Sequence, residues 1–495
     1  MKKCCVFILL IPVFATAQLQ LAKIFSDNMV LQRGKPVHIW GSAAPGARIK
    51  ASFSGISKTV TAGTTGSWHI YFKQQPACKQ PQSIEVKAGN ETILLQNILV
   101  GDIWLCIGQS NMEFPLQQEL HYGEEQPQIM QPLVRFFNPV YIGKNHFGKR
   151  FTDSMLQRLN AQNFYDGQWQ TCNSASAPIM SAIGYYFGKR ISQSENIPVG
   201  LVQLSIGGCA LETFISKEAL ANDKQFAVKI SGNWMLNEAL PVWIKQRAAE
   251  NIGGGKIVRQ GPAHAYQPGF AYSAGIEPML GLPITGVLLY QGESNAQEKD
   301  RVTEYAALQR LLITTYRQKW KQAGMPFYWV QLSSIDTIGY ASQLWPEFRN
   351  EQRKLLQQVK NSGMAVCSDL GAAANVHPTN KKEVAERLSR WALYATYHKN
   401  IVPSGPLPLN AVYKKDRVVI SFQYAAGLHT GDAGPIKGFS ADGKTGADAI
   451  IKNNKVLVRV KEKPLFIYYG WKPFTDANLV NAEKLPASTF KLKVQ

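Results

Sequence analysis

The chain has few cysteines for its length, and they do not form a metal-binding pattern. Seven cysteines occur in 495 residues, two of them within the first five positions. The other five are Cys78, Cys106, Cys172, Cys209 and Cys367. Their wide spacing supports no particular disulfide pairing, although a bridge between Cys78 and Cys172 stays open in an oxidising compartment. The eight histidines stand singly and no His-Glu-x-x-His motif occurs, so we expect no metal and no cofactor.

The sequence also lacks a long apolar run and a dense basic run. No stretch after the first residues approaches the roughly 20 apolar residues that a membrane-spanning helix needs. Lys and Arg outnumber Asp and Glu by 54 to 34, which gives a net charge of +20, but no nucleic-acid-binding motif is present. We therefore expect neither a membrane span nor a nucleic-acid partner. The diffuse positive charge fits an anionic substrate or a basic surface without a partner equally well.

Residues 1–17 have the pattern of a secretory signal peptide. The chain opens with Met-Lys-Lys, continues with an apolar run and reaches the small-residue site Ala15-Thr16-Ala17. The apolar run is too short for a permanent membrane anchor. This pattern predicts an exported protein, periplasmic or extracellular, whose mature chain begins at Gln18.

The spacing of apolar residues divides the mature chain into three parts. Residues 18–97 alternate apolar and polar residues between Gly-rich turns, which predicts an N-terminal β-sandwich domain. Residues 98–400 alternate short apolar runs with helical stretches, which predicts an α/β domain with buried parallel strands. Within it, residues 209–283 are predicted to be a loop-rich insertion that overhangs the site. Residues 401–495 return to short alternating strands and predict a C-terminal β-rich domain.

An amphipathic helix from about residue 380 to 398 is expected to close the α/β part. Val384, Leu388, Trp391 and Ala395 recur at steps of three and four residues, so they share one helix face. We expect this whole face to be buried.

Four apolar runs of the α/β part end in polar turns. The first run ends at Gly-Gln-Ser-Asn-Met around Ser110, and the second ends at Gly207-Gly208. The third ends at Gln-Gly-Glu-Ser-Asn, residues 291–295, and the fourth is followed by His377. Ligands of parallel α/β sheets bind at the carboxyl ends of the strands. We therefore expect the four turns to meet in one site.

The residues in these turns suit acyl transfer. Ser110 is the candidate nucleophile, and His377 is the candidate base that takes its proton and returns it to the leaving group. Backbone N–H groups and side-chain amides can stabilise the oxyanion. The candidates for that role are Ser110, Gly207, Gly208, Gln291 and Asn295. Each motif also has a plain alternative, because serine and asparagine often cap helices, paired glycines form turns, and a histidine before a helix can cap or pack.

These motifs resemble the sialate O-acetylesterase family of the SGNH hydrolase superfamily. Gln-Gly-Glu-Ser-Asn is the most specific of them, and the resemblance spans nearly the whole mature chain. Its other parts are Gly-Gln-Ser-Asn-Met-Glu, Gly207-Gly208, His377-Pro378 with the helix after it, residues 327–332 before Arg349 and Gln352, and residues 473–490. The resemblance implies a three-layer α/β/α, flavodoxin-like SGNH hydrolase domain with a mostly parallel sheet and flanking β domains. It also implies hydrolysis of O-acetyl esters on sugars.

One position departs from the family pattern. Family members usually carry an aspartate two residues before the histidine, where this chain has Asn375. An aspartate there would orient the imidazole and stabilise its charged form. The side-chain oxygen of Asn375 can accept a bond from the ring Nδ1–H but adds no charge. We therefore expect a catalytic pair of Ser110 and His377, with Asn375 or a main-chain carbonyl as the orienting group.

Four further residues are candidates for substrate binding: Gln109, Asn111, Glu293 and Arg349. Arg349 suits a substrate carboxylate and suits a structural ion pair equally well. Sialic acid is a carboxylate, so the expected substrate is an acetylated sugar or glycan with O-acetylated sialic acid as the lead. Acetylxylan or another acetylated polysaccharide is the alternative. The second function class is a non-catalytic glycan-binding protein with a decayed esterase site.

Overall fold

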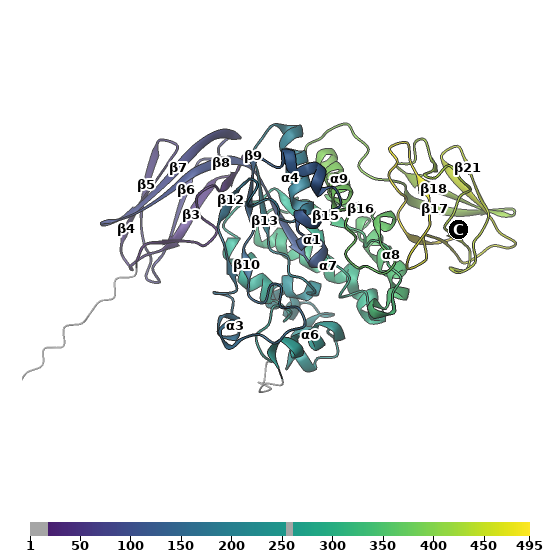
Figure 1. Cartoon of the computed structure of the whole chain (residues 1–495), viewed down its shortest axis with the longest axis horizontal. Helices are drawn as coiled ribbons and strands as arrows, with labels where there is room; N and C mark the ends of the chain where they lie inside the picture. The colour runs from purple at the N-terminus through teal and green to yellow at the C-terminus, as the bar shows by residue number, and fades with distance from the viewer. Residues whose placement is uncertain (1–17, 254–260) are drawn as a thin grey trace, which may run out of the picture.

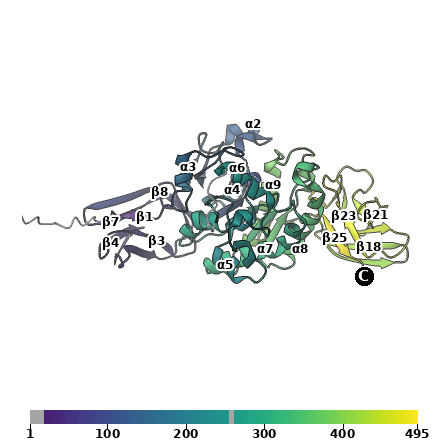
Figure 2. The same cartoon turned by 90° about the horizontal axis from the view of Figure 1, so that it is seen from below.

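The structure is a computed structural model that describes residues 18–253 and 261–495. The predicted signal peptide, residues 1–17, and residues 254–260 of the predicted insertion lie outside the described residues. Two β regions lie at opposite ends of the molecule, and a larger region of helices and strands lies between them (Figure 1). Seen from below, the three regions follow one another along the long axis (Figure 2). The protein is thus a mixed α/β protein with β structure at both ends.

The N-terminal region consists of two sheets packed face to face. One sheet has the order β1-β3-β6 (Gln20–Leu21, Val37–Ser42 and Ser67–Phe72). The other contains β2 (Val30–Gln32), β4 (Arg48–Phe53), β5 (Ile56–Thr61), β7 (Cys78–Ala88) and the first half of β8 (Glu91–Gly108). Buried and exposed residues alternate along β6, as expected for a strand with one face on a core. Between the sheets, the rings of Phe53 and Phe72 meet with centroids 5.8 Å apart.

Strand β8 runs without interruption from the N-terminal region into the centre of the molecule. Its first half has exposed positions and pairs with β7, whereas every residue from Ile98 to Gly108 is buried. Continuous burial is typical of a strand covered on both faces, and this half pairs with parallel strands on each side. The predicted domain boundary between residues 97 and 98 therefore falls inside one strand.

Five parallel strands carry the predicted site at their carboxyl ends. Their order in the sheet is β13 (Val199–Gln203), β8, β14 (Gly286–Tyr290), β15 (Phe327–Val330) and β16 (Ser362–Ala365). The first of them in the chain, β8, thus lies between the second and the third, so the strand order reverses beside β8. Ligand sites of α/β sheets form at such a reversal. Ser110 follows β8 directly.

The sheet as a whole is mixed. It has eleven strands, and β12 (Trp169–Cys172) pairs antiparallel with β9 (Gln131–Phe137) at one edge. Strands β4, β5 and β7 add antiparallel pairs around the first half of β8. The expectation of a mostly parallel sheet stays a prediction for the central region, where β9 also runs parallel to β13. In the sheet as a whole, the long strand β8 joins these parallel strands to antiparallel ones.

Helices cover both faces of the parallel strands. Phe327 and Tyr328 are neighbours on β15, so their side chains point to opposite faces. Tyr328 contacts Trp104 of β8, which contacts Phe187 of α4 (Ala182–Glu195), with ring centroids 5.7 Å and 5.0 Å apart. On the other face, Phe327 contacts Tyr316 of α7 (Lys299–Lys319) at 6.0 Å. Helix α9 (Lys381–Trp391) packs beside α4, and α8 (Trp345–Leu356) packs beside α7.

The closing helix is shorter than its apolar pattern predicts. Val384, Leu388 and Trp391 are buried on α9 as expected, but Ala395 is exposed. From Ala392 to Thr396 the chain forms a π-helical turn, with more residues per turn than an α-helix. The wider turn rotates Ala395 off the buried face.

Short helices and one short strand pair make up the rest of the central region. They are α1 (Ser110–Glu113), α2 (Tyr122–Glu125), α3 (Asp153–Arg158), α5 (Lys217–Asn222) and α6 (Val242–Ile252), together with the strand pair β10 (Val140–Tyr141) and β11 (Tyr165–Asp166). Of these elements, α1, α6 and β10 contribute residues to the surroundings of the predicted site.

The C-terminal region has its own core. It contains a four-stranded sheet in the order β17 (Leu407–Lys414), β18 (Arg417–Gln423), β22 (Lys455–Arg459) and β21 (Ala449–Lys452). A second sheet has the order β20 (Phe439–Ser440), β23 (Phe466–Tyr469) and β25 (Phe490–Lys493), and β19 (His429–Thr430) pairs with β24 (Leu479–Val480). Its buried apolar residues form a cluster separate from the main core. An ion pair between Arg390 and Glu483 joins it to the region of α9.

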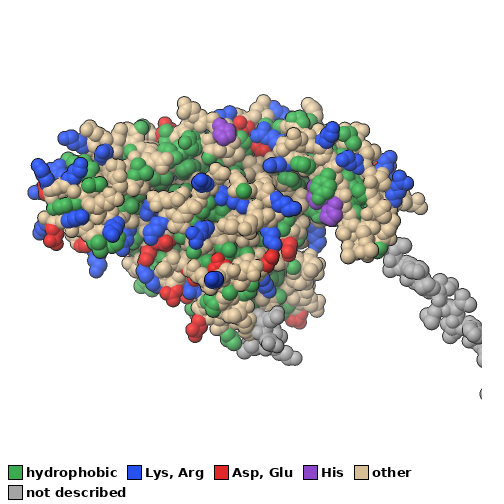
Figure 3. Space-filling view, turned by 180° about the vertical axis from the view of Figure 1, so that it is seen from behind, with side chains coloured by type: hydrophobic (Ala, Val, Ile, Leu, Met, Phe, Trp, Pro, Cys, Tyr) green, Lys and Arg blue, Asp and Glu red, His purple; other side chains and the backbone are tan. Residues whose placement is uncertain are grey.

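Three features of the described residues bear on the sequence-based expectations. The five described cysteines are all free thiols, so Cys78 and Cys172 are not bridged. Among residues 18–253 and 261–495, no helix is both long and apolar enough to cross a membrane. On the face shown in Figure 3, Lys and Arg side chains are scattered with Asp and Glu among them.

Candidate active site

Ser110 stands at the junction of β8 and the short helix α1. The strand is buried up to Gly108, and Gln109 caps the helix with an extended backbone. Ser110 is therefore the first helical residue, whose backbone N–H has no acceptor within the helix. In the described part of the chain this N–H has no other hydrogen-bond partner. Ser110 Oγ lies 2.7 Å from His377 Nε2, so the two residues that the sequence pairs are in direct contact.

His377 lies in the turn that precedes α9. Asn375 Oδ1 accepts the backbone N–H of His377 at 2.9 Å, and the Asn375 side chain is exposed. Within the described residues the ring Nδ1 has no hydrogen-bond partner, so the expected role of Asn375 as the orienter of the ring is corrected. Asn375 stabilises the turn instead. Burial first, and the positive charge of Lys381 second, lower the pKa of His377 to about 4, which keeps the ring neutral and able to accept a proton.

Gly207 and Gly208 form the turn after β13, next to Ser110. A Cβ atom on Gly207 would lie 3.9 Å from Ser110 Cβ. Gly208 has φ +75°, and a Cβ atom there would come within 2.7 Å of the rings of Phe147 and Tyr266, so both the backbone and the space require glycine. Tyr266 Oη donates to the Gly207 carbonyl at 2.6 Å. Because that carbonyl and the Gly208 N–H point in opposite directions across a trans peptide, this N–H points away from Tyr266.

Glu113 is the last residue of α1 and faces the glycine turn. Its Oε2 accepts the Gly207 N–H at 2.9 Å and the Tyr141 hydroxyl at 3.0 Å, and its Oε1 lies 3.4 Å from Lys144 Nζ. Burial raises the pKa of Glu113, against the opposing effects of Lys144 and Tyr141. Of the two glycine N–H groups, the one on Gly207 is therefore occupied, whereas the one on Gly208 has no partner among the described residues.

The side-chain amides of Gln291 and Asn295 do not face Ser110. Gln291 Nε2 donates to Asn295 Oδ1 at 2.7 Å, and Asn295 Nδ2 donates to Glu212 Oε2 at 3.0 Å. The ammonium of Lys229 lies 2.8 Å from Glu212 Oε1 and 2.6 Å from Glu304 Oε1. We call these five residues the Lys229 network. Because both amides are buried and bonded within it, the expectation that they stabilise an oxyanion is corrected.

Asn111 and Glu293 are buried behind Ser110. Asn111 Nδ2 donates to Glu293 Oε1 and, at 2.9 Å, to the carbonyl of Val376, while Asn111 Oδ1 accepts from Lys381 Nζ. Asn111 and Glu293 are each 1% exposed and neither lines the cavity described below. We call Lys381, Asn111 and Glu293 the Lys381 network. The expectation that Asn111 and Glu293 bind substrate is corrected, because they have no access to it.

Gln109 does reach the cavity. Its Oε1 accepts from the Ser294 N–H at 3.3 Å and from Gln291 Nε2 at 3.4 Å. Its Nε2 has no partner in the described part of the chain, and the residue lines the same cavity as Ser110. The amide of Gln109 can therefore donate to a bound ligand, and substrate binding stays its predicted role.

Arg349 does not line the cavity that Ser110 faces. It is 0% exposed on α8, and its guanidinium donates to the backbone carbonyls of Gly470, Lys472 and Pro473 in the C-terminal region. Burial lowers the pKa of Arg349 to about 9. The expectation that Arg349 pairs with a substrate carboxylate is corrected, because this side chain joins α8 to the C-terminal region through main-chain acceptors.

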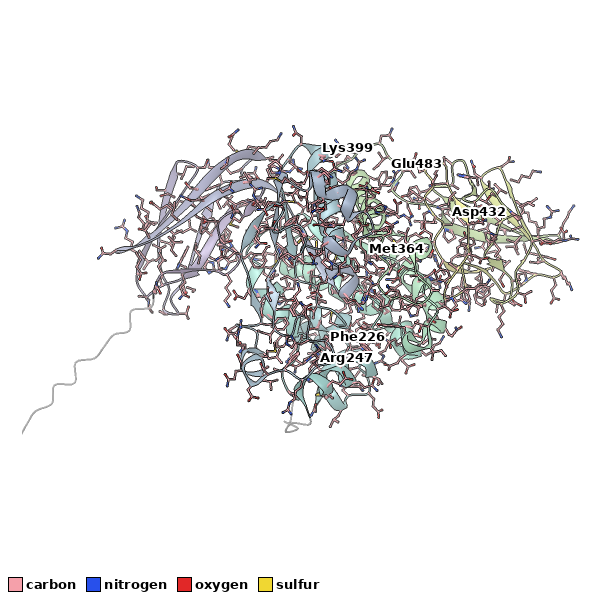
Figure 4. All side chains as sticks on the ribbon, viewed as in Figure 1. Phe226, Arg247, Met364, Lys399, Asp432 and Glu483 are labelled. Atoms are coloured by element: carbon pink, nitrogen blue, oxygen red, sulfur yellow. The ribbon has the colours of Figure 1, made fainter. Side chains whose placement is uncertain are left out.

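A cavity of about 530 Å³ opens over Ser110 and His377. Aromatic residues line much of it, and they are Phe114, Tyr141, Phe147, Phe151, Trp243, Tyr266 and Tyr340. Trp243 and Tyr266 come from the predicted insertion. Among the described residues, Lys144 is the only Lys or Arg that lines the cavity. Arg247 of α6 (labelled in Figure 4) packs its guanidinium 4.3 Å from the Phe147 ring and 4.8 Å from the Trp243 ring.

Sequence reasoning missed four residues of this site: Glu113, Tyr141, Lys144 and Lys381. Glu113 follows Ser110 by three positions, and Lys381 follows His377 by four. Positions three residues apart are neighbours on a helix, so the first spacing could have indicated Glu113 on α1. The second spacing carries no such signal, because His377 precedes α9. Tyr141 and Lys144 carry no such signal, because only the fold brings their segment to Ser110.

The central region matches a known family. Residues 252–392 match the model of the carbohydrate esterase family described as sialic acid-specific acetylesterase. The match includes His377 and the Gln-Gly-Glu-Ser-Asn turn. It begins after Ser110 and the glycine turn.

Relatives extend the similarity over most of the chain. The sialate O-acetylesterase of Mus musculus is 26% identical over 80% of this chain and 80% of the mouse protein. The sialate O-acetylesterase of Rattus norvegicus is 28% identical over 78% of this chain and 75% of the rat protein. The crystal structure of a carbohydrate acetylesterase from Xanthomonas citri superposes with a TM-score of 0.78 and 28% identity, covering 95% of this chain and 99% of that one. These similarities confirm the resemblance to the sialate O-acetylesterase family and show that the protein is a carboxylic ester hydrolase.

Proposed function

We propose that the protein is an exported carbohydrate esterase that removes O-acetyl groups from sugars through an acetyl-serine intermediate. The observation that carries this proposal is the 2.7 Å contact between Ser110 Oγ and His377 Nε2 at the floor of the cavity. O-acetylated sialic acid is the lead substrate, as the names of the mammalian relatives suggest. Export is inferred from the signal-like pattern of residues 1–17.

The reaction begins with attack by Ser110 Oγ on the acetyl carbonyl carbon. His377 Nε2 takes the hydroxyl proton, and the resulting tetrahedral intermediate carries a negative oxygen. When the intermediate collapses, the bond between carbon and the sugar oxygen breaks, and His377 returns the proton to that oxygen. A water molecule then attacks the acetyl-serine with His377 again as base, which releases acetate and restores Ser110.

Backbone N–H groups are the donors that we assign to the oxyanion. The N–H groups of Ser110 and Gly208 lack partners among the described residues, and both residues line the cavity. The free Nε2 of Gln109 is a third donor at the same place. Uncharged donors of this kind stabilise a developing oxyanion without reorganisation, and one such donor typically contributes about 3–4 kcal/mol to the barrier. The N–H of Gly207 contributes less, because Glu113 already accepts its bond.

The cavity suits a sugar ring better than a flexible acyl chain. Aromatic faces such as those of Trp243 and Tyr340 can stack on the C–H face of a sugar, and Lys144 can pair with a carboxylate. Lys144 is already 3.4 Å from Glu113, so the local charge is nearly balanced. The acetylated polysaccharide stays the alternative substrate for this reason.

The nucleophile is tested with an aryl acetate. Ser110→Ala is expected to lower kcat/KM by about 10⁴-fold or more, because the remaining site supplies only oxyanion stabilisation and binding. Phe474→Ala, a change at an exposed residue of the C-terminal region, serves as the matched control and keeps full activity. A folded wild-type protein that releases no acetate from aryl acetates or acetylated sugars would contradict the esterase proposal.

The substrate is tested by comparing O-acetylated sialic acid with acetylated xylo-oligosaccharides. If sialic acid is the substrate, Lys144→Gln raises KM for it by about tenfold, since a hydrogen bond to a charged group contributes roughly 1.5–3 kcal/mol. The same change leaves KM for the neutral sugar nearly unchanged. Equal effects on both sugars would favour the polysaccharide.

A further inference from the structure

Lys381 is a fully buried lysine with one hydrogen-bond partner. It is the first residue of α9 and is 0% exposed. Its Nζ donates to Asn111 Oδ1 and lies 4.9 Å from the Phe114 ring centroid and 5.5 Å from the Tyr290 ring centroid. Among the described residues no carboxylate lies within ion-pair distance of it. A buried ammonium without a paired carboxylate is costly, so a use for this charge is expected.

The single bond of Lys381 leads directly to both catalytic candidates. Asn111 follows Ser110 in the chain, and its Nδ2 donates to the carbonyl of Val376, the residue before His377. One amide therefore bridges α1, which carries the serine, and the turn that carries the histidine. Lys381 fixes the orientation of that amide, because an ammonium can bond only to its oxygen end.

The other end of the network is a carboxyl group that Lys381 does not touch. Glu293 Oε1 accepts from Asn111 Nδ2, and its Oε2 is buried without a partner. Burial raises the pKa of Glu293 to about 7 and lowers the pKa of Lys381 to about 7. The other ionisable groups that act on Lys381 are Cys367 and Glu119. Neither is hydrogen-bonded to it.

We propose that Lys381 is a positioning residue of the esterase, which holds Asn111 so that Ser110 and the turn of His377 keep their contact. The proposal rests on the function proposed above, because it assigns Lys381 a part in that reaction. Lys381 touches neither the cavity nor the reacting atoms, so it acts through Asn111 and through its charge.

Besides its hydrogen bond to Asn111, Lys381 also acts on His377 through its positive charge. After burial, Lys381 is the cause that lowers the pKa of His377. A positive charge near the imidazole disfavours its protonated form, so His377 stays a free base into acidic solution. Removing the charge is expected to raise the pH below which activity falls.

The experiment compares kcat, KM and the pH profile of kcat/KM for the full chain and its Lys381→Met variant on an aryl acetate. The variant is expected to lose kcat on the order of 10²-fold, as a small misplacement of reacting groups does, with KM within twofold of the wild type. The acid limb of its pH profile is expected to move upward from about 4 toward the ordinary value of histidine.

Two further variants separate the hydrogen bond from the charge. Lys381→Gln keeps an N–H donor for Asn111 without a charge, so it is expected to recover most of kcat while the acid limb stays raised. Lys382→Met changes the next lysine of α9, which lies half-buried over the Tyr186 ring, and is expected to behave as the wild type in both respects.

Failure of this proposal and failure of the proposed function would give different results. An inactive wild type would overturn the function and with it the role of Lys381. An active wild type together with a folded Lys381→Met variant of unchanged kcat and pH profile would overturn the role of Lys381 alone. If Lys381→Met does not fold, the double variant Lys381→Met/Glu293→Gln removes both buried charges, and the same two readouts decide.

Discussion

Two of the described lysines, Lys229 and Lys381, are fully buried, and their surroundings differ. Lys229 is bonded to two carboxylates, Glu212 and Glu304, and to a main-chain carbonyl. Lys381 is bonded to one amide. Burial disfavours the Glu212 carboxylate, but Lys229 and Asn295 outweigh it and the pKa of Glu212 is lowered. The pKa of Glu293, which has no such partner, is raised to about 7.

The difference separates a structural network from a functional one. Every charge of the Lys229 network faces an opposite charge, so the network fixes α7 and the third turn. The Lys381 network keeps its two charges apart with an amide between them, and both titrate near neutrality. Ionisable groups with shifted pKa values are concentrated at functional sites.

The largest effect on stability is expected for Lys229→Met. This change leaves two buried carboxylates without their cation, and such a loss typically costs about 3–5 kcal/mol of the free energy of unfolding. Urea unfolding measures it. Lys224→Met, at an exposed lysine nearby, is expected to change stability by less than about 0.5 kcal/mol. Equal unfolding midpoints for the two variants would show that the Lys229 network does not stabilise the fold.

A smaller effect, an increase in the free energy of unfolding at pH 8, is expected for Glu293→Gln. The folded-state pKa of Glu293 is raised, so the ionised carboxylate destabilises the fold as pH rises from about 4.5 through about 7. Relative to the wild type, the glutamine variant should gain about 2–3 kcal/mol of the free energy of unfolding between pH 5 and pH 8. Thermal unfolding at the two pH values checks this. A variant that is less stable at pH 8 than at pH 5, relative to wild type, contradicts it.

The smallest effect is expected for Asn375→Asp. Its side chain bonds to the backbone N–H of His377 and is exposed, so a new charge there acts through solvent. An exposed charge contributes at most about 1 kcal/mol, and kcat/KM should stay equal or rise within about fivefold. Steady-state kinetics on an aryl acetate measure it. A large loss would mean that Asn375, rather than the Lys381 network, positions the turn.

The parallel strands that lead to the candidate site could be predicted from the sequence. The buried runs before Ser110, Gly207 and Gln291 predict parallel strands because continuous apolar residues suit a sheet covered on both faces. The mixed character of the sheet could not be predicted, since β8 changes partners midway without a break in its sequence. Ala395 was misplaced because a π-turn leaves no mark in apolar spacing.

The site could be predicted only as far as residue type allows. Ser110 and His377 follow from their chemistry and from the strands that precede them. Gln291 and Asn295 have the right amides, but a sequence does not say whether an amide faces a cavity or a buried carboxylate. Arg349 has the right charge for a substrate carboxylate, yet its partners are carbonyls more than a hundred residues away.

Strand β8 makes the N-terminal region an inseparable part of the hydrolase. The strand that pairs with β7 is eighteen residues long and ends at Gly108, just before Gln109, the N-cap of α1. Removing or exchanging the N-terminal region would interrupt strand β8, which leads to Ser110. A variant with an exchanged N-terminal region would therefore have to keep β8 whole, whereas the described C-terminal region has its own sheets and core and shares no strand with the central sheet.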